Sequence, residues 1–123
     1  MTSLNLILIF LSVSLSVAAQ LLLKKGMSSQ IVQSALADSV HIQSIITILT
    51  NFWVLTGLFA YVSSAAIWLV VLSKIEVSKA YPFVGLGFIG TMLFAYWFLN
   101  EPLTLTKALG TLLVVCGVLL ISK

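Results

Sequence analysis

Long apolar runs separated by short polar stretches set the pattern of this chain. One run has no charged residue between Pro82 and Leu99, opens at a Tyr-Pro step and ends at Asn100-Glu101-Pro102. A helix needs about 20 apolar residues to cross the hydrocarbon core of a membrane. Proline suits the first turn of a helix, because its missing N–H has no partner to lose there. The stretch therefore predicts one membrane-spanning helix that starts at the Tyr-Pro step.

Three further apolar runs have comparable lengths. Together they predict four spanning helices, near residues 4–23, 51–72, 81–99 and 104–122. The expected fold class is an all-α membrane protein with four transmembrane helices, which form a single domain over residues 1–123. Neither a β-barrel nor a soluble bundle accounts for a chain with so few charges.

The first run has a second interpretation, a cleaved signal peptide, because Ser16-Val17-Ala18 follows the small-x-small pattern of a cleavage site. No lysine or arginine precedes this run, and the run is long for the core of a signal peptide. We therefore expect a retained span, with Lys24 and Lys25 at the water interface.

The first connection is long, from residue 26 to residue 50. Its polar part has Ile31, Val32, Ala35 and Leu36 at helical spacing, which fits a short helix on the membrane surface or a mobile loop. The later part, residues 40–49, is more apolar and could lengthen the second span. Residues 41–72 are too many for one upright helix, so we expect a tilt, a kink or an interfacial start.

Composition agrees with a membrane protein, since 61% of the residues are hydrophobic and only 7% are charged. The lysines are scattered over the span ends and form no basic, aromatic-laced face, which argues against a nucleic-acid partner. A single cysteine, Cys116, excludes an internal disulfide, and a single histidine, His41, argues against a zinc site. The chain has no catalytic constellation, so we expect no catalytic residues, no metal and no cofactor.

Lysines give no orientation for the four predicted spans. Each side of the membrane receives three of them, Lys24, Lys25 and Lys107 on one side against Lys74, Lys79 and Lys123 on the other. Because the positive-inside rule depends on a difference between the sides, insertion in either direction or in both stays open.

A polar stripe marks the end of the first span. Ser16, Gln20 and Lys24 follow one another at four-residue steps and share a helix face. An amide in an apolar segment needs partners, and lysine can serve as a point charge for an anion such as a phosphate. We expect these three residues to contact a substrate and Lys25 only to anchor the span. Glu101 is a further candidate for substrate binding, and its charge is either a buried partner for a lysine or a solvated group near the start of the last helix.

Two sets of glycines lie in the later spans. Gly85, Gly87 and Gly90 match a dinucleotide-binding fingerprint by letter, but that motif requires a preceding strand. We expect them instead to permit close helix packing or a bend, and so to give the third helix flexibility. Gly110 and Gly117 lie two turns apart on one face of the last helix, where we expect a helix–helix interface.

Three segments resemble the drug/metabolite transporter superfamily: SVAAQLLLKKG, IWLVVLSKIEVSKAYPFVGLGFIGTMLFAYWFLNEPLT and GTLLVVCGVLLI. The chain is similar to the short, EamA-like four-span members. It most resembles the subunits of the aminoarabinose-phosphoundecaprenol flippase, through the Ser-Val-Ala-x-Gln run, the Ala-Tyr-Pro step and the x-Glu-Pro turn. The small multidrug resistance transporters are the next group. The resemblance covers most of the chain except residues 28–50.

The resemblance implies transport of a polyprenyl-phosphate-linked sugar, or of a related lipid-borne group, across the bacterial inner membrane. It implies a homodimer or heterodimer with four spans from each chain, and paired last helices, in agreement with Gly110 and Gly117. Tyr81 matches a binding-site tyrosine of the small multidrug transporters, which implies a substrate contact there.

The chain also departs from the small multidrug transporters. Their essential membrane glutamate is replaced by Ser16, and a binding-site tryptophan by Val84. Proton-coupled export of cationic drugs therefore does not follow from the resemblance. Two alternatives to a flippase subunit stay open: an exporter of drugs or metabolites with a different coupling site, and a membrane subunit that supports a partner without transporting anything.

Overall fold

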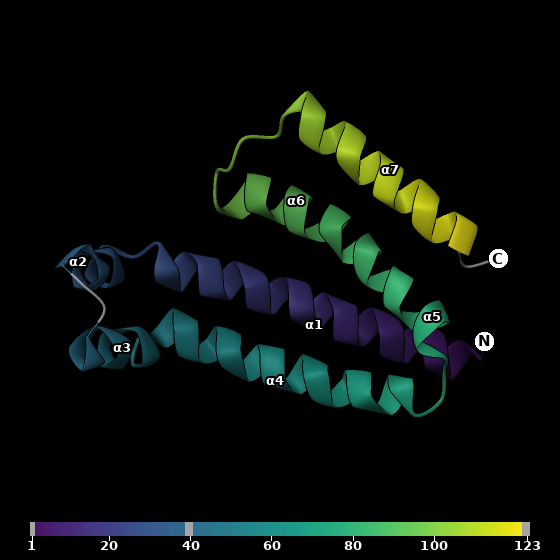
Figure 1. Ribbon diagram of the computed structural model, residues 1–123, viewed down its shortest axis with the longest axis horizontal. Helices are drawn as coiled ribbons and strands as arrows, with labels where there is room; N and C mark the ends of the chain where they lie inside the picture. Colours follow the sequence, from purple (N-terminus) through teal and green to yellow (C-terminus); the bar gives the residue numbers. More distant parts are fainter. Residues whose placement is uncertain (1, 39–40, 122–123) are drawn as a thin grey trace.

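The regular elements of the structure are all helices. The computed structural model describes residues 2–38 and 41–121, and no strand occurs in those two segments. The elements in chain order are α1 (Ser3–Met27), α2 (Gln30–Asp38), α3 (Ile42–Leu49), α4 (Phe52–Leu72), α5 (Val77–Ala80), the 3₁₀-helix η1 (Tyr81–Gly85), α6 (Leu86–Phe98) and α7 (Leu105–Ile121). Figure 1 shows α4, α1, α6 and α7 side by side in that order. The predicted all-α class is confirmed for the described residues.

Three helical segments of the described chain have the length and composition of membrane spans: Ser3–Met27, Phe52–Leu72 and Val77–Phe98. The last of these combines α5, η1 and α6. α7 is apolar but has only 17 residues. At 1.5 Å per residue it is about 26 Å long, slightly less than the ~30 Å thickness of a hydrocarbon core. Three predicted spans are thus confirmed in length and composition, and the fourth is a shorter apolar helix.

Two glycines allow α1 to pack closely against α4. A Cβ atom added at Gly26 would lie 2.6 Å from a methyl group of Val54 and 2.9 Å from its backbone nitrogen. A Cβ atom added at Gly57 would lie 2.9 Å from Cγ of Leu23. Glycine is therefore the residue that permits this approach of the two backbones. The sequence analysis assigned no role to either of these glycines.

A reciprocal pair of hydrogen bonds also joins α1 to α4. The Ser12 hydroxyl donates to the carbonyl oxygen of Ser64 at 2.9 Å, and the Ser64 hydroxyl donates to the carbonyl oxygen of Ser12 at 2.7 Å. Both serines are buried. Interhelical hydrogen bonds of this kind contribute about 0.6 kcal/mol each in membrane proteins. They fix the relative position of the two helices at mid-length.

The third span starts differently from the prediction of one helix beginning at the Tyr-Pro step. Helical structure begins at Val77 as α5, tightens into η1 and continues as α6. Pro82 lies at the start of η1. Proline has no backbone N–H, and its ring crowds the preceding turn, so it disturbs a regular α-helix at this point. The expectation of a helix start at residue 81 is corrected accordingly.

The first connection contains two short helices. α2 covers the stretch in which apolar spacing predicted a helix. α3 is a separate helix and does not lengthen the second span, because Asn51 caps the start of α4. The side-chain oxygen of Asn51 accepts hydrogen bonds from the N–H groups of Trp53 (3.0 Å) and Val54 (3.3 Å). The Ser44 hydroxyl of α3 donates to the carbonyl oxygen of Ala35 in α2 at 2.9 Å. In Figure 1 both short helices are seen nearly end-on, so they lie across α1 and α4.

The helix row has two different ends (Figure 1). We call the end with α2, α3 and the α6–α7 connection the loop end; the opposite end holds the start of α1, the α4–α5 turn and the end of α7. α1 continues past its predicted end to Met27, so Lys24 and Lys25 are helical. Lys25 Nζ lies 4.3 Å from the centre of the Trp53 ring, a cation–π contact that suits an anchoring residue. Lys123, one of the lysines that were compared between the two membrane sides, lies outside the described residues.

Candidate functional site

A cavity of about 980 Å³ is lined by residues of α1, α4, η1, α6, α7 and the connection between α6 and α7. Its apolar lining consists of Val13, Val17, Ala65, Trp68, Val84, Gly87, Phe88, Met92, Ala95, Pro102, Gly110 and Val114. Its polar lining consists of Ser12, Ser16, Gln20, Tyr61, Ser64, Tyr81, Thr91, Glu101, Lys107 and Thr111. Apolar walls with a few polar groups are typical of a ligand site.

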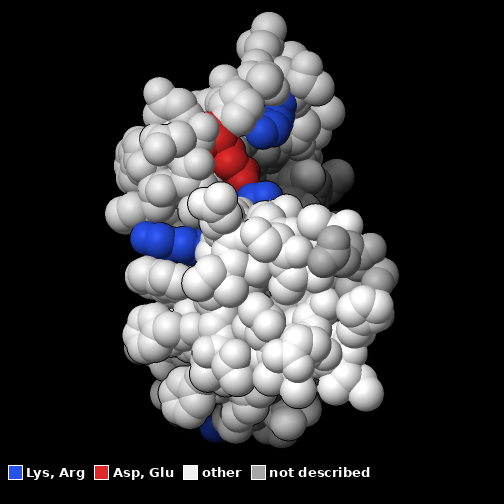
Figure 2. All heavy atoms as spheres, turned by 90° about the vertical axis from the view of Figure 1, so that its left-hand side faces the viewer, with Lys and Arg blue, Asp and Glu red and all other residues white. Residues whose placement is uncertain are grey.

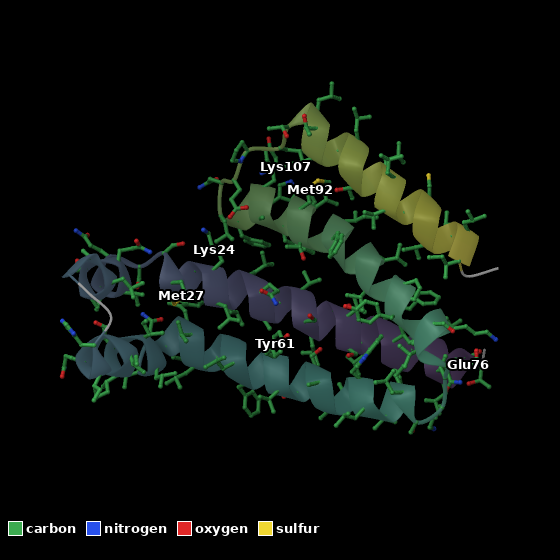
Figure 3. All side chains as sticks on the ribbon, viewed as in Figure 1. Lys24, Met27, Tyr61, Glu76, Met92 and Lys107 are labelled. Atoms are coloured by element: carbon green, nitrogen blue, oxygen red, sulfur yellow. The ribbon has the colours of Figure 1, made fainter. Side chains whose placement is uncertain are left out.

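Four of the five predicted substrate contacts line this cavity: Ser16, Gln20, Tyr81 and Glu101. Lys24 does not belong to the lining and is exposed. Figure 3 shows it near the loop end of α1. Residues four apart on a helix are rotated by about 40° relative to one another, so a stripe of this kind drifts around the axis. Ser16 and Gln20 therefore line the cavity while Lys24, further along, does not.

Glu101 is held at the loop end of the cavity by a turn that follows α6. Asn100 has a φ of 56°, in the left-handed region that asparagine adopts more readily than most residues. After this turn the N–H of Glu101 donates to the carbonyl oxygen of Ala95 at 3.2 Å. The Glu101 side chain is partly buried, and its carboxylate forms neither an ion pair nor a hydrogen bond with any described residue. It is thus neither a paired buried charge nor a fully solvated one.

Lys107 supplies the cation of the cavity, a role that the sequence analysis missed. Its Nζ atom donates to the carbonyl oxygen of Pro102 at 2.9 Å. Figure 3 shows the labelled Lys107 and Met92 in the region between α6 and α7, and Figure 2, which views the loop end, shows acidic atoms with basic atoms on either side. The available signal was a lysine that closely follows the Asn-Glu-Pro turn at the same membrane edge.

Hydroxyl groups continue the polar lining away from the loop end. Ser16 of α1 and Thr91 of α6 line the cavity, and their hydroxyls form no hydrogen bond with other described residues. Thr111 of α7 donates to the sulfur of Met92 at 3.4 Å. The polar groups therefore extend along the cavity, from the charges at the loop end into the apolar part of the helix row.

Tyr81 lies at the other end of the third span from Glu101, because it begins η1 whereas Glu101 follows α6. It lines the cavity together with Trp68 and Val84 and is 63% exposed. The predicted contacts are therefore divided between the two ends of the cavity and do not form one cluster.

The glycines of the third span lie at helix contacts. A Cβ atom added at Gly87 would lie 3.0 Å from Val13, and one added at Gly85 would lie 3.0 Å from Val114. Gly90 is less crowded, since its added Cβ would meet nothing closer than 3.7 Å. Close packing is thus one role of Gly85 and Gly87, and flexibility of this helix stays a prediction.

Gly110 and Gly117 differ from the other glycines. A Cβ atom added at either position would meet nothing within 4 Å. Gly110 is exposed and belongs to the cavity lining. Neither glycine is at a close helix contact within the described chain, and the predicted interface between chains stays a prediction.

The lining supplies one carboxylate, one ammonium, one amide and several hydroxyls. No group of three or more His, Cys, Asp or Glu residues that could hold a metal ion occurs in the described segments. Such a set of groups can bind a charged, hydroxyl-rich head group.

Comparisons with known proteins point to one family. The sequence matches the EamA-like transporter family over residues 5–123. A protein of Erwinia tasmaniensis is 37% identical over 117 residues, which cover 89% of this chain and 87% of the relative, and is named "Probable 4-amino-4-deoxy-L-arabinose-phosphoundecaprenol flippase subunit ArnF". The ArnF relative of Serratia proteamaculans is 35% identical over 91% of this chain and 87% of its own length.

A third relative bears the corresponding name with the subunit ArnE. It comes from Pseudomonas fluorescens and is 38% identical over 71 residues, 58% of this chain, and the match spans 62% of its own length. No solved structure matches the chain. With a family match over nearly its whole length and several helices able to span a membrane, the chain is a multi-pass membrane protein that belongs to the EamA-like transporter family.

Proposed function

We propose that the protein is a subunit of a flippase that moves a polyprenyl-phosphate-linked sugar across the bacterial inner membrane. The names of its relatives, which combine a flippase, a sugar and a phosphoundecaprenol lipid, support this function. Within the structure one observation carries it: a single cavity joins a charged end to a row of hydroxyls between apolar helices.

The physical problem of a flippase is to shelter a polar head group while the lipid tail stays in the bilayer. An unshielded phosphate or sugar hydroxyl loses its hydrogen bonds with water in hydrocarbon, at a cost of several kcal/mol for each group. Hydroxyls such as those of Ser16 and Thr91 can replace part of that hydration along the path. The apolar lining lets the first part of the tail remain in contact with the site.

Part of the cavity lining is exposed on the surface of the chain, which supports assembly with a second subunit. Gln20, Tyr61 and Tyr81 line the cavity and are exposed. A homodimer or a heterodimer with a similar chain would cover these groups. In such an assembly α7 acts as the fourth membrane span, with Gly110 and Gly117 at the contact. Each chain then contributes four spans around the substrate path.

The proposal is tested by flipping of a labelled polyprenyl-phosphate sugar in vesicles, with the protein reconstituted alone and together with a co-expressed partner subunit. Lys107→Ala and Gln20→Ala should lower the rate by roughly tenfold or more, because each removes a hydrogen-bonding group from the cavity. Lys24→Ala should abolish transport if this lysine contacts the phosphate, and Lys24→Arg should retain part of it.

Lys25→Ala is the matched control, because Lys25 stacks on Trp53 and does not line the cavity. Its rate should stay close to that of the parent at equal protein level. Full activity in the Lys107 and Gln20 variants would contradict the assignment of the cavity as the lipid path. Export of a cationic dye without lipid movement would favour the small-molecule exporter. No transport in any assembly would favour a supporting subunit.

A further inference from the structure

We infer that Glu101 and Lys107 select the head group, with the carboxylate binding a protonated amine and the ammonium binding a phosphate of the same lipid. This inference rests on the proposed function and names the groups that distinguish one lipid-linked sugar from another. The site would therefore prefer an amino sugar over the corresponding hydroxy sugar.

The connection between α6 and α7, which carries Glu101 and leads directly into the helix turn with Lys107, is held by two hydrogen bonds. The N–H of Glu101 donates to the carbonyl oxygen of Ala95 at the end of α6. The ammonium of Lys107 donates to the carbonyl oxygen of Pro102, the residue that follows Glu101. Both charges thus line the same cavity, Glu101 from the connection that follows α6 and Lys107 from the first turn of α7.

The two charges are close in the sequence and yet unpaired with each other. No ion pair links them in the described segments, since the ammonium is directed at a neutral carbonyl and the carboxylate has no hydrogen bond there. A lysine ammonium has three donors, and a carboxylate accepts at two oxygens. Both groups therefore retain the capacity to bind a ligand.

A ligand with one positive and one negative group satisfies both residues at once. A phosphate lipid that carries a hydroxyl in place of the amine leaves the carboxylate facing a neutral group. Because Glu101 is partly buried, a bound ligand would remove more of its water without supplying a counter-charge, which disfavours binding. The lipid in the relatives' names carries both an amino group and a phosphate, as this arrangement requires.

The test compares two polyprenyl-phosphate sugars that differ only in an amine or a hydroxyl at one carbon of the sugar. Binding is measured with the protein in nanodiscs, and flipping is measured in vesicles. The variants are Glu101→Gln, Glu101→Asp, Lys107→Gln and the control Glu76→Gln. Glu76 is exposed, does not line the cavity and lies at the opposite end of the helix row (Figure 3).

The parent should bind the amino lipid about tenfold more tightly than the hydroxy lipid, the usual size for a hydrogen bond to a charged group. Glu101→Gln should remove this preference by weakening the amino lipid alone, and Glu101→Asp should keep part of it. Lys107→Gln should weaken both lipids equally, and Glu76→Gln should change neither. A carboxylate that only stabilised the turn would affect both lipids to the same extent.

The inference is overturned if the parent binds both lipids with equal affinity, or if Glu101→Gln keeps the preference for the amino lipid. In either case the flippase proposal still stands if flipping is observed. A preference that depends on Glu101 without any flipping supports the selection site and contradicts the flippase. Failure to bind either lipid contradicts both.

Discussion

Asn100 decides where Glu101 can be placed. Its φ of 56° turns the chain out of α6, in a conformation that costs most residues roughly 1–2 kcal/mol. Asn100→Ala should therefore lower the free energy of unfolding by about that amount, while Asn100→Gly, which has no Cβ atom, should be close to neutral. Unfolding in detergent micelles, followed by circular dichroism, measures the difference. An alanine variant as stable as the glycine variant would show that the turn is not strained.

At the same scale, the charges of the cavity differ from those that sequence spacing indicated. Lys24 shares a face with Gln20 by count, but Lys107 lies in the lining and Lys24 does not. The difference arises because Lys107 belongs to another helix, and its distance from Glu101 in space follows from the connection between α6 and α7.

At the level of elements, the contact between α1 and α4 depends on glycine at a point of close approach. Gly26→Ala would place a Cβ atom 2.9 Å from the backbone nitrogen of Val54, where only a shift of the helices could relieve the clash. We expect a loss of about 1–3 kcal/mol in the free energy of unfolding. Gly110→Ala is the control, because its Cβ meets nothing within 4 Å, and it should be neutral or slightly stabilising. Equal stability of the two variants would refute the close contact.

α3 carries an exposed apolar face next to the start of α4. Ile42, Ile45 and Leu49 recur at helical spacing and are 78%, 46% and 48% exposed, and Phe52 at the start of α4 is 70% exposed. We predict that α3 lies in the membrane interface with this face toward the acyl chains. A spin label at position 45 should collide more often with lipid-soluble oxygen than with a water-soluble nickel complex. A label at Gln43, which is also exposed, should show the opposite preference. The same accessibility at both positions would place α3 outside the membrane.

At the scale of the whole molecule, α7 exposes a face that nothing in the described chain covers. Gly110 and Gly117 have free space around them, and Leu109, Leu113 and Leu120 are largely exposed. We predict that the double change of both glycines to leucine weakens subunit association by tenfold or more, because the helix backbones can no longer approach closely. Energy transfer between labelled chains in lipid measures this association. Unchanged association would place the interface elsewhere.

The sequence by itself determined the all-α class and three helices of spanning length, with their approximate ends. This succeeded because crossing a membrane is a local requirement: about 20 consecutive apolar residues must satisfy their own backbone hydrogen bonds within the segment. The helical spacing of α2 and the family resemblance are likewise properties of continuous stretches. The start of the third span was misplaced, because Pro82 permits a 3₁₀ turn within a longer helical segment as well as a helix start.

Only the tertiary structure decided which side chains share the cavity. Spanning helices such as α4 are apolar almost all round, and the polar stripe of α1 is short, so the sequence gives little indication of how each helix is rotated about its axis. That rotation follows from packing, here from Gly26 and Gly57 and from the Ser12–Ser64 hydrogen bonds. The charged pair Glu101 and Lys107 could be recognised only once the turn at Asn100 had placed both groups at one end of the same cavity.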